Sequence, residues 1–271
     1  MKCIPIPGNG NVNRVSIAPA DVTHALLSIG VTEGKVVLVH PDAIVAAQFP
    51  PMPNERRLEL LIESIEAAIG ASGTLVIPTF SYSFTRGEPF DVLNTPSSVG
   101  MVSECFRRLP GVCRSADPIF SFAARGPHAR ELCAPVQECF GKNSVFGALN
   151  QLNAEIVDLG CSMSRGGTFV HYVETAHGVD YRYSKVFSGT VILPDGQSCE
   201  RSVIYNVRDL NRKSEADLRR LQKRLEAEKK LRIANIGRSR ILAVTAKDLF
   251  DTAWKMLDED RASLIAEGAE K

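Results

Sequence analysis

Val36-Val37-Leu38-Val39 and Leu75-Val76-Ile77 are the two stretches of sequence that decide the fold of this chain. Each is short, rich in β-branched residues and apolar at every position, which is typical of a strand covered by helices on both faces. Residues 55–69, between them, place leucine and isoleucine at helical spacing. Strand, helix, strand is the pattern of a parallel α/β unit, so we expect a right-handed crossover and an α/β protein.

The flanking sequence extends this pattern. We expect helices over residues 21–29 and 95–109 and a buried strand over residues 156–160. The second helix would start at Thr95-Pro96, a capping hydroxyl followed by proline at the first helical position.

The last third of the chain predicts antiparallel structure. Residues 185–193 alternate between apolar and polar, Pro194-Asp195-Gly196 predicts a turn, and residues 199–207 return, which indicates a β-hairpin. Two short strands over 233–245 and a helix over 246–260 should follow. Residues 212–232 hold nine Lys/Arg against four Asp/Glu and follow an amphipathic pattern. We interpret this segment as a helix whose polar face is either solvated or binds an anion.

No repeat, low-complexity tract or linker interrupts this order. The sequence therefore predicts one domain over residues 1–271, with residues 1–14 irregular. Its fold class is α/β: a mixed, largely parallel central sheet flanked by helices, with an antiparallel β-hairpin appendage.

Composition excludes several kinds of partner. The 271 residues are 44% hydrophobic and 23% charged, and 32 Lys+Arg against 31 Asp+Glu leave a net charge of +1. A balanced chain has no global field to hold nucleic acid or an anionic membrane. No apolar stretch is long enough to cross a bilayer, and the first residues lack an apolar signal core. We expect a cytoplasmic protein with no nucleic-acid or membrane partner; a homodimer is possible.

The seven cysteines are odd in number and scattered, without a C-x-x-C pair. We expect reduced, mostly packed thiols and no metal site. Cys161, between a strand and a loop, is an alternative candidate for a nucleophile.

The segment Gly166-Gly167-Thr168-Phe169-Val170-His171-Tyr172-Val173-Glu174 carries the clearest chemistry. On a helix, His171 and Glu174 are three residues apart and share a face. A carboxylate beside an imidazole fixes its tautomer, raises its basicity and stabilises the imidazolium, as a general base requires. A surface ion pair is the more common explanation of this spacing alone.

Several blocks, in order along the chain, resemble those of the aminoglycoside 3-N-acetyltransferase family of antibiotic acetyltransferases. They are Val37-Leu38-Val39-His40; Gly73-Thr74-Leu75-Val76-Ile77-Pro78-Thr79-Phe80; Thr95-Pro96-Ser97 with Gly100; Arg114-Ser115-Ala116-Asp117-Pro118-Ile119-Phe120-Ser121-Phe122-Ala123-Ala124 with Gly126-Pro127; Gly141-Lys142-Asn143-Ser144; and Leu159-Gly160 with Thr168, His171 and Glu174. The resemblance covers roughly residues 15–260.

The resemblance implies a mixed α/β fold distinct from that of GNAT acetyltransferases. It also implies acyl transfer from acetyl-coenzyme A, or another short acyl-coenzyme A, to an amine of an amino sugar or aminoglycoside. His171 would be the general base and Glu174 its partner, with direct attack in a ternary complex. The coenzyme A candidates are His40, Thr79, Phe80, Ser115, Phe122 and Ala123. Phe80 and Phe122 are alternatively core residues, Ser115 a loop hydroxyl and His40 a half-buried histidine.

Two departures from the family pattern affect the substrate. Pro41-Asp42 follows His40 where the family usually has serine, and Asp117 stands where it usually has histidine. We expect Asp117 to reshape donor or acceptor contacts and Arg182 to meet a phosphate on the acceptor. Two other classes of function stay open: a coenzyme-A-binding relative with impaired turnover, and a hydrolase that uses Cys161 with His171.

Overall fold

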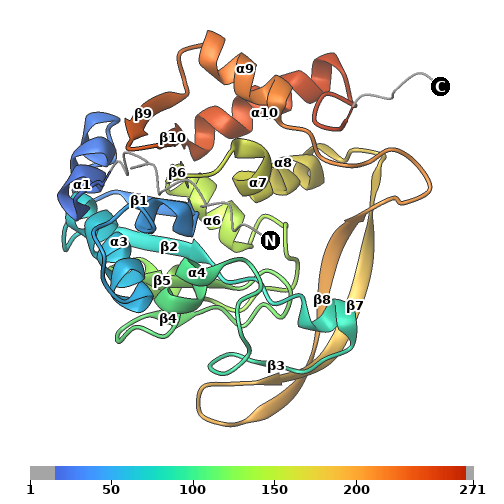
Figure 1. Ribbon diagram of the computed structural model, residues 1–271. Coiled ribbons are helices and arrows are strands. Elements are labelled where there is room, and N and C mark those ends of the chain that lie inside the picture. Colours follow the sequence, from blue (N-terminus) through green and yellow to red (C-terminus); the bar gives the residue numbers. More distant parts are fainter. Residues whose placement is uncertain (1–15, 267–271) are drawn as a thin grey trace, which may run out of the picture.

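The computed structural model describes residues 16–266, so the expected irregular segment 1–14 and Cys3 lie outside the described residues. Its strands form a seven-stranded sheet, ordered β4-β5-β2-β1-β6-β10-β9, and a three-stranded sheet, ordered β3-β7-β8 (Figure 1). The strands are β1 (Val36–Pro41), β2 (Thr74–Pro78), β3 (Phe90–Asp91), β4 (Cys113–Arg114), β5 (Phe122–Arg125), β6 (Glu155–Leu159), β7 (Arg182–Ile192), β8 (Ser198–Arg208), β9 (Arg232–Ile236) and β10 (Ser239–Thr245). The helices are α1 (Pro19–Ser28), α2 (Ala43–Ala46), α3 (Asn54–Ile69), η1 (Ser83–Arg86), α4 (Met101–Phe106), α5 (Ala129–Leu132), α6 (Val145–Gln151), α7 (Met163–Gly166), η2 (Gly167–Phe169), α8 (Val170–His177), α9 (Arg219–Ala227) and α10 (Ala246–Glu259).

The central sheet is mixed, as expected, but its parallel part is smaller than the sequence predicts. β1 runs parallel to β2 on one side and to β6 on the other. The outer pairs β5–β2, β4–β5, β6–β10 and β9–β10 are antiparallel. Parallel pairing is therefore confined to the three strands β2, β1 and β6, because both outer flanks are built from returning strands.

Helices cover both faces of this sheet, which explains why the runs Val36–Val39 of β1 and Leu75–Ile77 of β2 are apolar at every position. Along β1, Val37 and Val39 belong to the core that contains α1, α3 and α4. Val36 and Leu38 belong to the opposite core, which contains α6, α8 and α10. The alternation is the period of two that a strand imposes on its side chains.

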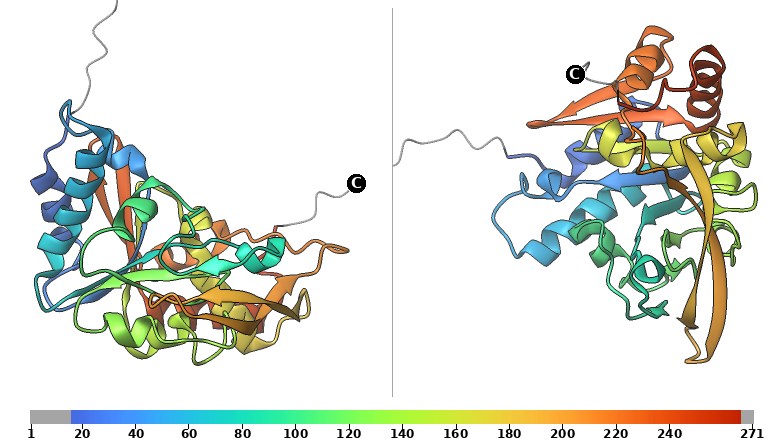
Figure 2. Two further views of the ribbon diagram at one scale, coloured as in Figure 1. Left: turned by 90° about the horizontal axis from the view of Figure 1, so that it is seen from below. Right: turned by 90° about the vertical axis from the view of Figure 1, so that its right-hand side faces the viewer.

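The expected hairpin is confirmed. β7 and β8 pair in antiparallel register from Arg182↔Arg208 to Ile192↔Ser198, and β3 adds to the outer end of β7. The hairpin runs along one side of the molecule rather than joining the central sheet (Figure 2). Because β7 starts shortly after α8 ends, its first residues lie next to the helix that carries His171 and Glu174.

The helix expected over residues 95–109 is shorter than predicted, since α4 covers only Met101–Phe106. Thr95 does not cap it: its hydroxyl accepts a hydrogen bond from the Asp91 amide at 2.8 Å. The Ser98 amide donates to the Phe80 carbonyl at 2.8 Å. These bonds hold residues 92–99 as a loop against the end of β2.

The helix expected over residues 212–232 is also shorter, at Arg219–Ala227. Residues before it instead form a bridge between Ala216 and Ile265. Within residues 16–266, no helix combines the length and apolar character that crossing a membrane requires.

Candidate active site

His171 and Glu174 lie on one face of α8 and contact each other, as their spacing predicts. The distance between His171 Nδ1 and Glu174 Oε2 is 2.7 Å. The Glu174 side chain is fully buried, whereas that of His171 is 20% exposed. The helix thus presents an imidazole to the outside with a carboxylate fixed behind it.

The side chains of Tyr181, which immediately precedes β7, and Arg182, the first residue of β7, complete the surroundings of Glu174. The Tyr181 hydroxyl donates to Glu174 Oε1 at 3.0 Å. Arg182 Nε lies 2.6 Å from Glu174 Oε2, although its N–H is not aligned for a hydrogen bond. Burial by itself would raise the pKa of Glu174, but the charge and hydrogen bond of His171, the Arg182 charge and the Tyr181 hydroxyl together lower it.

An ionised Glu174 fixes the tautomer of His171. A carboxylate can only accept, so the contact with Glu174 favours the tautomer that carries its hydrogen on Nδ1. In that tautomer the approach of Arg182 Nη2 to the same atom is a contact without a hydrogen bond. Nε2 is left as the ring atom that can take up a proton from a ligand. The pair has the equipment of a general base.

Arg182 is placed differently from the expectation that it meets an acceptor phosphate. Its side chain is 3% exposed and faces Glu174. Its Nη1 donates to the Asn206 carbonyl at 3.3 Å, and Nη2 lies 2.9 Å from His171 Nδ1. The guanidinium therefore neutralises a buried carboxylate, a task that leaves it little reach toward solvent.

The chain contains a surface counterpart of this histidine–glutamate spacing. His128 Nδ1 lies 3.1 Å from Glu131 Oε2, and these side chains are 42% and 56% exposed. Spacing is the same in the two pairs, so burial of the carboxylate is what distinguishes the candidate base from a surface ion pair.

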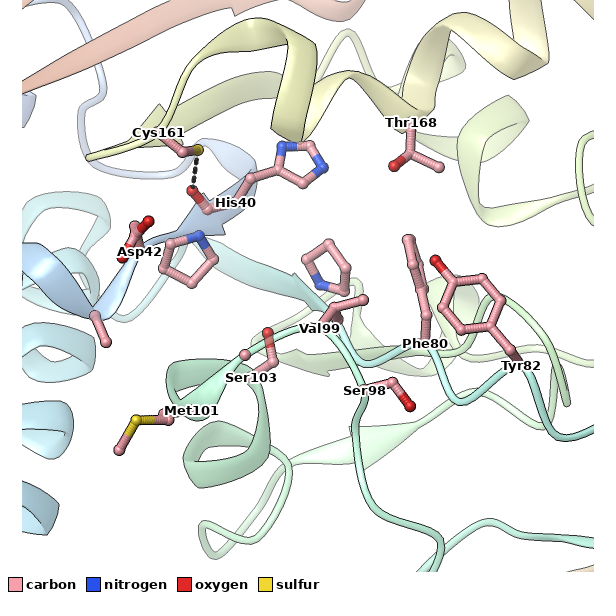
Figure 3. Close-up of a pocket in the computed structure, with 14 residues that line it drawn as sticks. His40, Asp42, Phe80, Tyr82, Ser98, Val99, Met101, Ser103, Cys161 and Thr168 are labelled. Carbon is pink, nitrogen blue, oxygen red and sulfur yellow. Dashed lines mark hydrogen bonds between the residues drawn. The ribbon is translucent and has the colours of Figure 1, made fainter. Parts of the chain in front are cut away.

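A cavity of about 530 Å³ opens at the carboxyl ends of β1 and β2, where open α/β sheets usually bind ligands. His40, Cys161 and Thr168 lie on one side, opposite Phe80, Tyr82 and Ser98 (Figure 3). The cavity is lined by His40, Pro41, Asp42, Ala43, Pro78, Phe80, Tyr82, Ser98, Val99, Gly100, Met101, Ser103, Cys161 and Thr168.

His40 is the lining residue that most needs a ligand. It is 9% exposed, and neither ring nitrogen makes an aligned hydrogen bond within the described part of the chain. Its Nδ1 is 3.2 Å from Asp158 Oδ1, because β1 and β6 pair in a register that places His40 opposite Asp158. Buried polar atoms without partners are uncommon and often mark a place for water or a ligand.

Cys161 lies beside His40. Its Sγ is 3.3 Å from the His40 carbonyl oxygen and 4.0 Å from Asp158 Oδ1. The thiol of Cys161 thus contacts His40 and Asp158. The Cys-His hydrolase alternative would instead require a contact between this thiol and His171.

A chain of aromatic contacts runs from the cavity to the candidate base. Tyr82 packs edge-on against Phe120 with ring centroids 5.6 Å apart. Phe120 contacts Phe140 at 4.7 Å, and Phe140 contacts the His171 ring at 5.4 Å. Thr168, which lines the cavity, precedes His171 by three residues. His171 does not itself line the cavity; three successive aromatic contacts and the turn from Thr168 to His171 connect it to the lining.

Of the residues expected around coenzyme A, only His40 and Phe80 line this cavity. Thr79, Ser115, Phe122 and Ala123 are buried in the wall behind it. The Ser115 hydroxyl, for example, accepts a hydrogen bond from the Phe122 amide at 2.9 Å. These residues support the cavity in the structure and do not face it.

Asp117 is also turned inward. The residue is 3% exposed. Its carboxylate accepts hydrogen bonds from the Ile119 and Phe120 amides, each at 2.8 Å. Burial, opposed by these bonds, raises its pKa. Asp117 thus shapes the loop that carries Phe120, which differs from the direct substrate contact expected from the sequence.

Comparison with known proteins identifies the family. The model of the aminoglycoside 3-N-acetyltransferase family matches residues 38–258. This chain belongs to that family. Its members are acyltransferases, so the expected class of enzyme is confirmed, and so is the likeness to these enzymes rather than to GNAT proteins.

Individual relatives agree with the family assignment. Aminoglycoside N(3)-acetyltransferase IV of Salmonella is 31% identical over 246 residues, which cover 89% of this chain and 87% of the relative. The acetyltransferase-like protein YokD of Bacillus subtilis is 24% identical over 258 residues, which cover 86% of this chain and 90% of the relative. The crystal structure of the AAC(3)-IVa apoenzyme superposes with a TM-score of 0.76 and 27% identity, covering 93% of this chain and 92% of that one.

The sequence blocks did not reveal several cavity residues of this acetyltransferase-family chain. Tyr82, Ser98, Val99 and Met101 line the cavity, but they lie on an irregular loop and a short helix with no local chemical signal. Tyr181 was missed as a partner of Glu174 because its contact depends on how β7 packs against α8.

Proposed function

We propose that this chain is an acyl-CoA-dependent N-acyltransferase. It would move an acetyl or other short acyl group to an amine of an amino sugar or an aminoglycoside. The observation that carries the proposal is a fully buried carboxylate, Glu174, held 2.7 Å from a partly exposed imidazole, His171. Thr168, three residues before His171, lines the cavity at the strand ends.

The acceptor defines what the base must do. An amine is protonated near neutral pH and becomes a nucleophile only after it loses a proton. His171 Nε2 receives that proton while Nδ1–H stays on Glu174, whose negative charge stabilises the imidazolium. Arg182 and Tyr181 keep Glu174 ionised and in place, so the imidazole does not have to reorganise during the transfer.

Bound acyl-CoA supplies an acyl group already activated as a thioester, so the enzyme needs no covalent intermediate. The cavity suits such a donor in two respects. Phe80, Val99 and Met101 offer apolar contact to a pantetheine arm. His40, whose ring nitrogens make no aligned hydrogen bond within the described residues, offers a polar contact to an amide or phosphate oxygen. The AAC-IIIb relative was solved as a binary complex with CoASH.

Two acceptor classes are retained. Relatives were solved with apramycin, a gentamicin and sisomicin, which favours an aminoglycoside. The net charge of +1 provides no general attraction for a polycation, which keeps a nucleotide-linked or polysaccharide amino sugar open.

The experiment measures release of free coenzyme A from acetyl-CoA with a panel of aminoglycosides and amino sugars. In the variants His171→Ala and Glu174→Gln, kcat/KM should fall by roughly 10²- to 10⁴-fold, the usual worth of a positioned base. His128→Ala is the matched control, because it removes a histidine of identical spacing from the surface, and it should leave activity unchanged.

Other outcomes separate the remaining alternatives. Thermal stabilisation by coenzyme A without turnover on any amine would indicate an impaired relative. Activity that disappears in Cys161→Ala would favour the cysteine hydrolase. Full activity in His171→Ala would exclude His171 as the base while leaving the family assignment intact.

A further inference from the structure

Two cysteines far from the candidate base approach each other closely. Cys113 lies on the edge strand β4, and Cys133 ends the short helix α5. Both are free thiols and half-buried, and their Sγ atoms are 2.8 Å apart. A disulfide bond is about 2.0 Å long, so the two sulfurs are within a small movement of bonding distance.

We propose that Cys113 and Cys133 form a redox-active dithiol that a peroxide converts into an intramolecular disulfide.

The surroundings assign different roles to the two thiols. The hydrogen bond with Cys133 lowers the pKa of Cys113 to about 7, against its burial and with help from the nearby Arg130 charge. The same hydrogen bond, together with burial, raises the pKa of Cys133. Cys113 is therefore the thiolate that reacts first, and Cys133 the thiol that resolves the product.

The chemistry balances with a peroxide as the oxidant. Cys113 Sγ attacks one peroxide oxygen, the O–O bond breaks, and a sulfenic acid and hydroxide form. Cys133 Sγ then attacks the oxidised sulfur: the S–S bond forms, the S–O bond breaks, and the leaving oxygen departs as water with the Cys133 proton. Two thiols are oxidised, and one hydrogen peroxide is reduced to two waters.

Other described cysteines lack this arrangement. Burial is the main cause that raises the pKa of both Cys105 and Cys139, and for Cys139 the Asp117 carboxylate adds to it. Thiols of that kind are inert because the nucleophile is the thiolate. Cys105 therefore serves as a control.

The first test counts free thiols after treatment with hydrogen peroxide and maps the disulfide-linked peptides. The count should fall from the seven cysteines of the chain by two, with Cys113 linked to Cys133. Cys105→Ser should lose the same pair, whereas Cys113→Ser and Cys133→Ser should not form the link. An unchanged thiol count in the wild-type chain, or a link between other cysteines, would overturn the proposal.

A second measurement needs no variant, in case the serine substitutions disturb folding. The alkylation rate of Cys113 should rise with pH around a midpoint near 7; a midpoint at the ordinary thiol value of about 8.5 would contradict the assigned role. The oxidised chain should also melt about 5 to 10 °C higher than the reduced one, because the bond constrains the unfolded chain.

Discussion

At the scale of single residues, Glu174 is the point on which the site depends. It is fully buried and contacts His171, Tyr181 and Arg182. A buried charge is tolerated only while its partners remain. The site should therefore be sensitive to the loss of Arg182 even though Arg182 does not face the cavity.

Replacing Arg182 with glutamine should destabilise the protein by roughly 3 kcal/mol, the usual cost of breaking a buried ion pair. The folded-state pKa of Glu174 is lowered, so its stabilising contribution is present above the unfolded pKa of about 4.3 and is lost as pH falls through the folded value. Without Arg182 the folded value rises toward the unfolded one, so this contribution should be smaller and its loss should be complete at a higher pH. Urea unfolding as a function of pH measures both effects.

The control for this variant is Arg208→Gln. Arg208 lies 3.6 Å from Glu215, and these side chains are 45% and 79% exposed. An exposed pair contributes at most about 1 kcal/mol. Equal destabilisation in the two variants would show that the Arg182 pair has no special worth.

The sequence predicts the contact between His171 and Glu174 but not the burial of Glu174. His171 and Glu174 share the spacing of His128 and Glu131, and helical geometry predicts a contact in both cases. Burial of Glu174 comes from Tyr181 and Arg182 on a different element. A local pattern cannot report that, because it depends on how β7 packs against α8.

At the scale of elements, α7 fits over the His40–Asp158 pair because its last residue has no side chain. A Cβ on Gly166 would clash with Asp158 Oδ1 and would come 3.0 Å from His40 Cγ. This helix end therefore lies against His40, which lines the cavity.

Gly166→Ala should push His40 and Asp158 out of place. We expect KM for acetyl-CoA to rise by about tenfold and stability to fall by roughly 1–3 kcal/mol, as in other overpacked sites. Steady-state kinetics and thermal unfolding measure these effects. Gly178→Asn, at a left-handed position that ends α8 in open space, should change neither much. An unaltered KM for acetyl-CoA in Gly166→Ala would show that the positions of His40 and Asp158 do not affect donor binding.

Element prediction succeeded where periodicity was sustained and failed where tertiary hydrogen bonds intervened. The pattern over residues 55–69 predicted α3 within one residue. Thr95-Pro96 has the composition of a helix start, yet Asp91 and Arg114 bond to Thr95 and hold it in a loop. Their positions are fixed by strands distant in sequence, so no local signal excludes that helix.

At the scale of the whole molecule, ligand binding should appear as added stability. Coenzyme A at about 100 times its Kd should contribute about 2.7 kcal/mol, or a rise in Tm of roughly 5 to 10 °C. Differential scanning fluorimetry measures it, with ATP as the control nucleotide that lacks the pantetheine arm. An equal shift with ATP would attribute binding to the nucleotide alone, and no shift with coenzyme A would contradict the donor site. The homodimer stays a prediction, which light scattering can check.

The strand order also has a consequence for how this protein is made. β6 pairs with β1 on one side and with β10 on the other, and β10 comes near the end of the described chain. A nascent chain therefore carries β6 with one open edge until the residues of β10 have been synthesised. Such an edge invites pairing between molecules. We therefore expect a higher yield of folded protein when the chain is overproduced slowly at low temperature. Completion of the sheet requires contacts between distant parts of the chain, which form slowly.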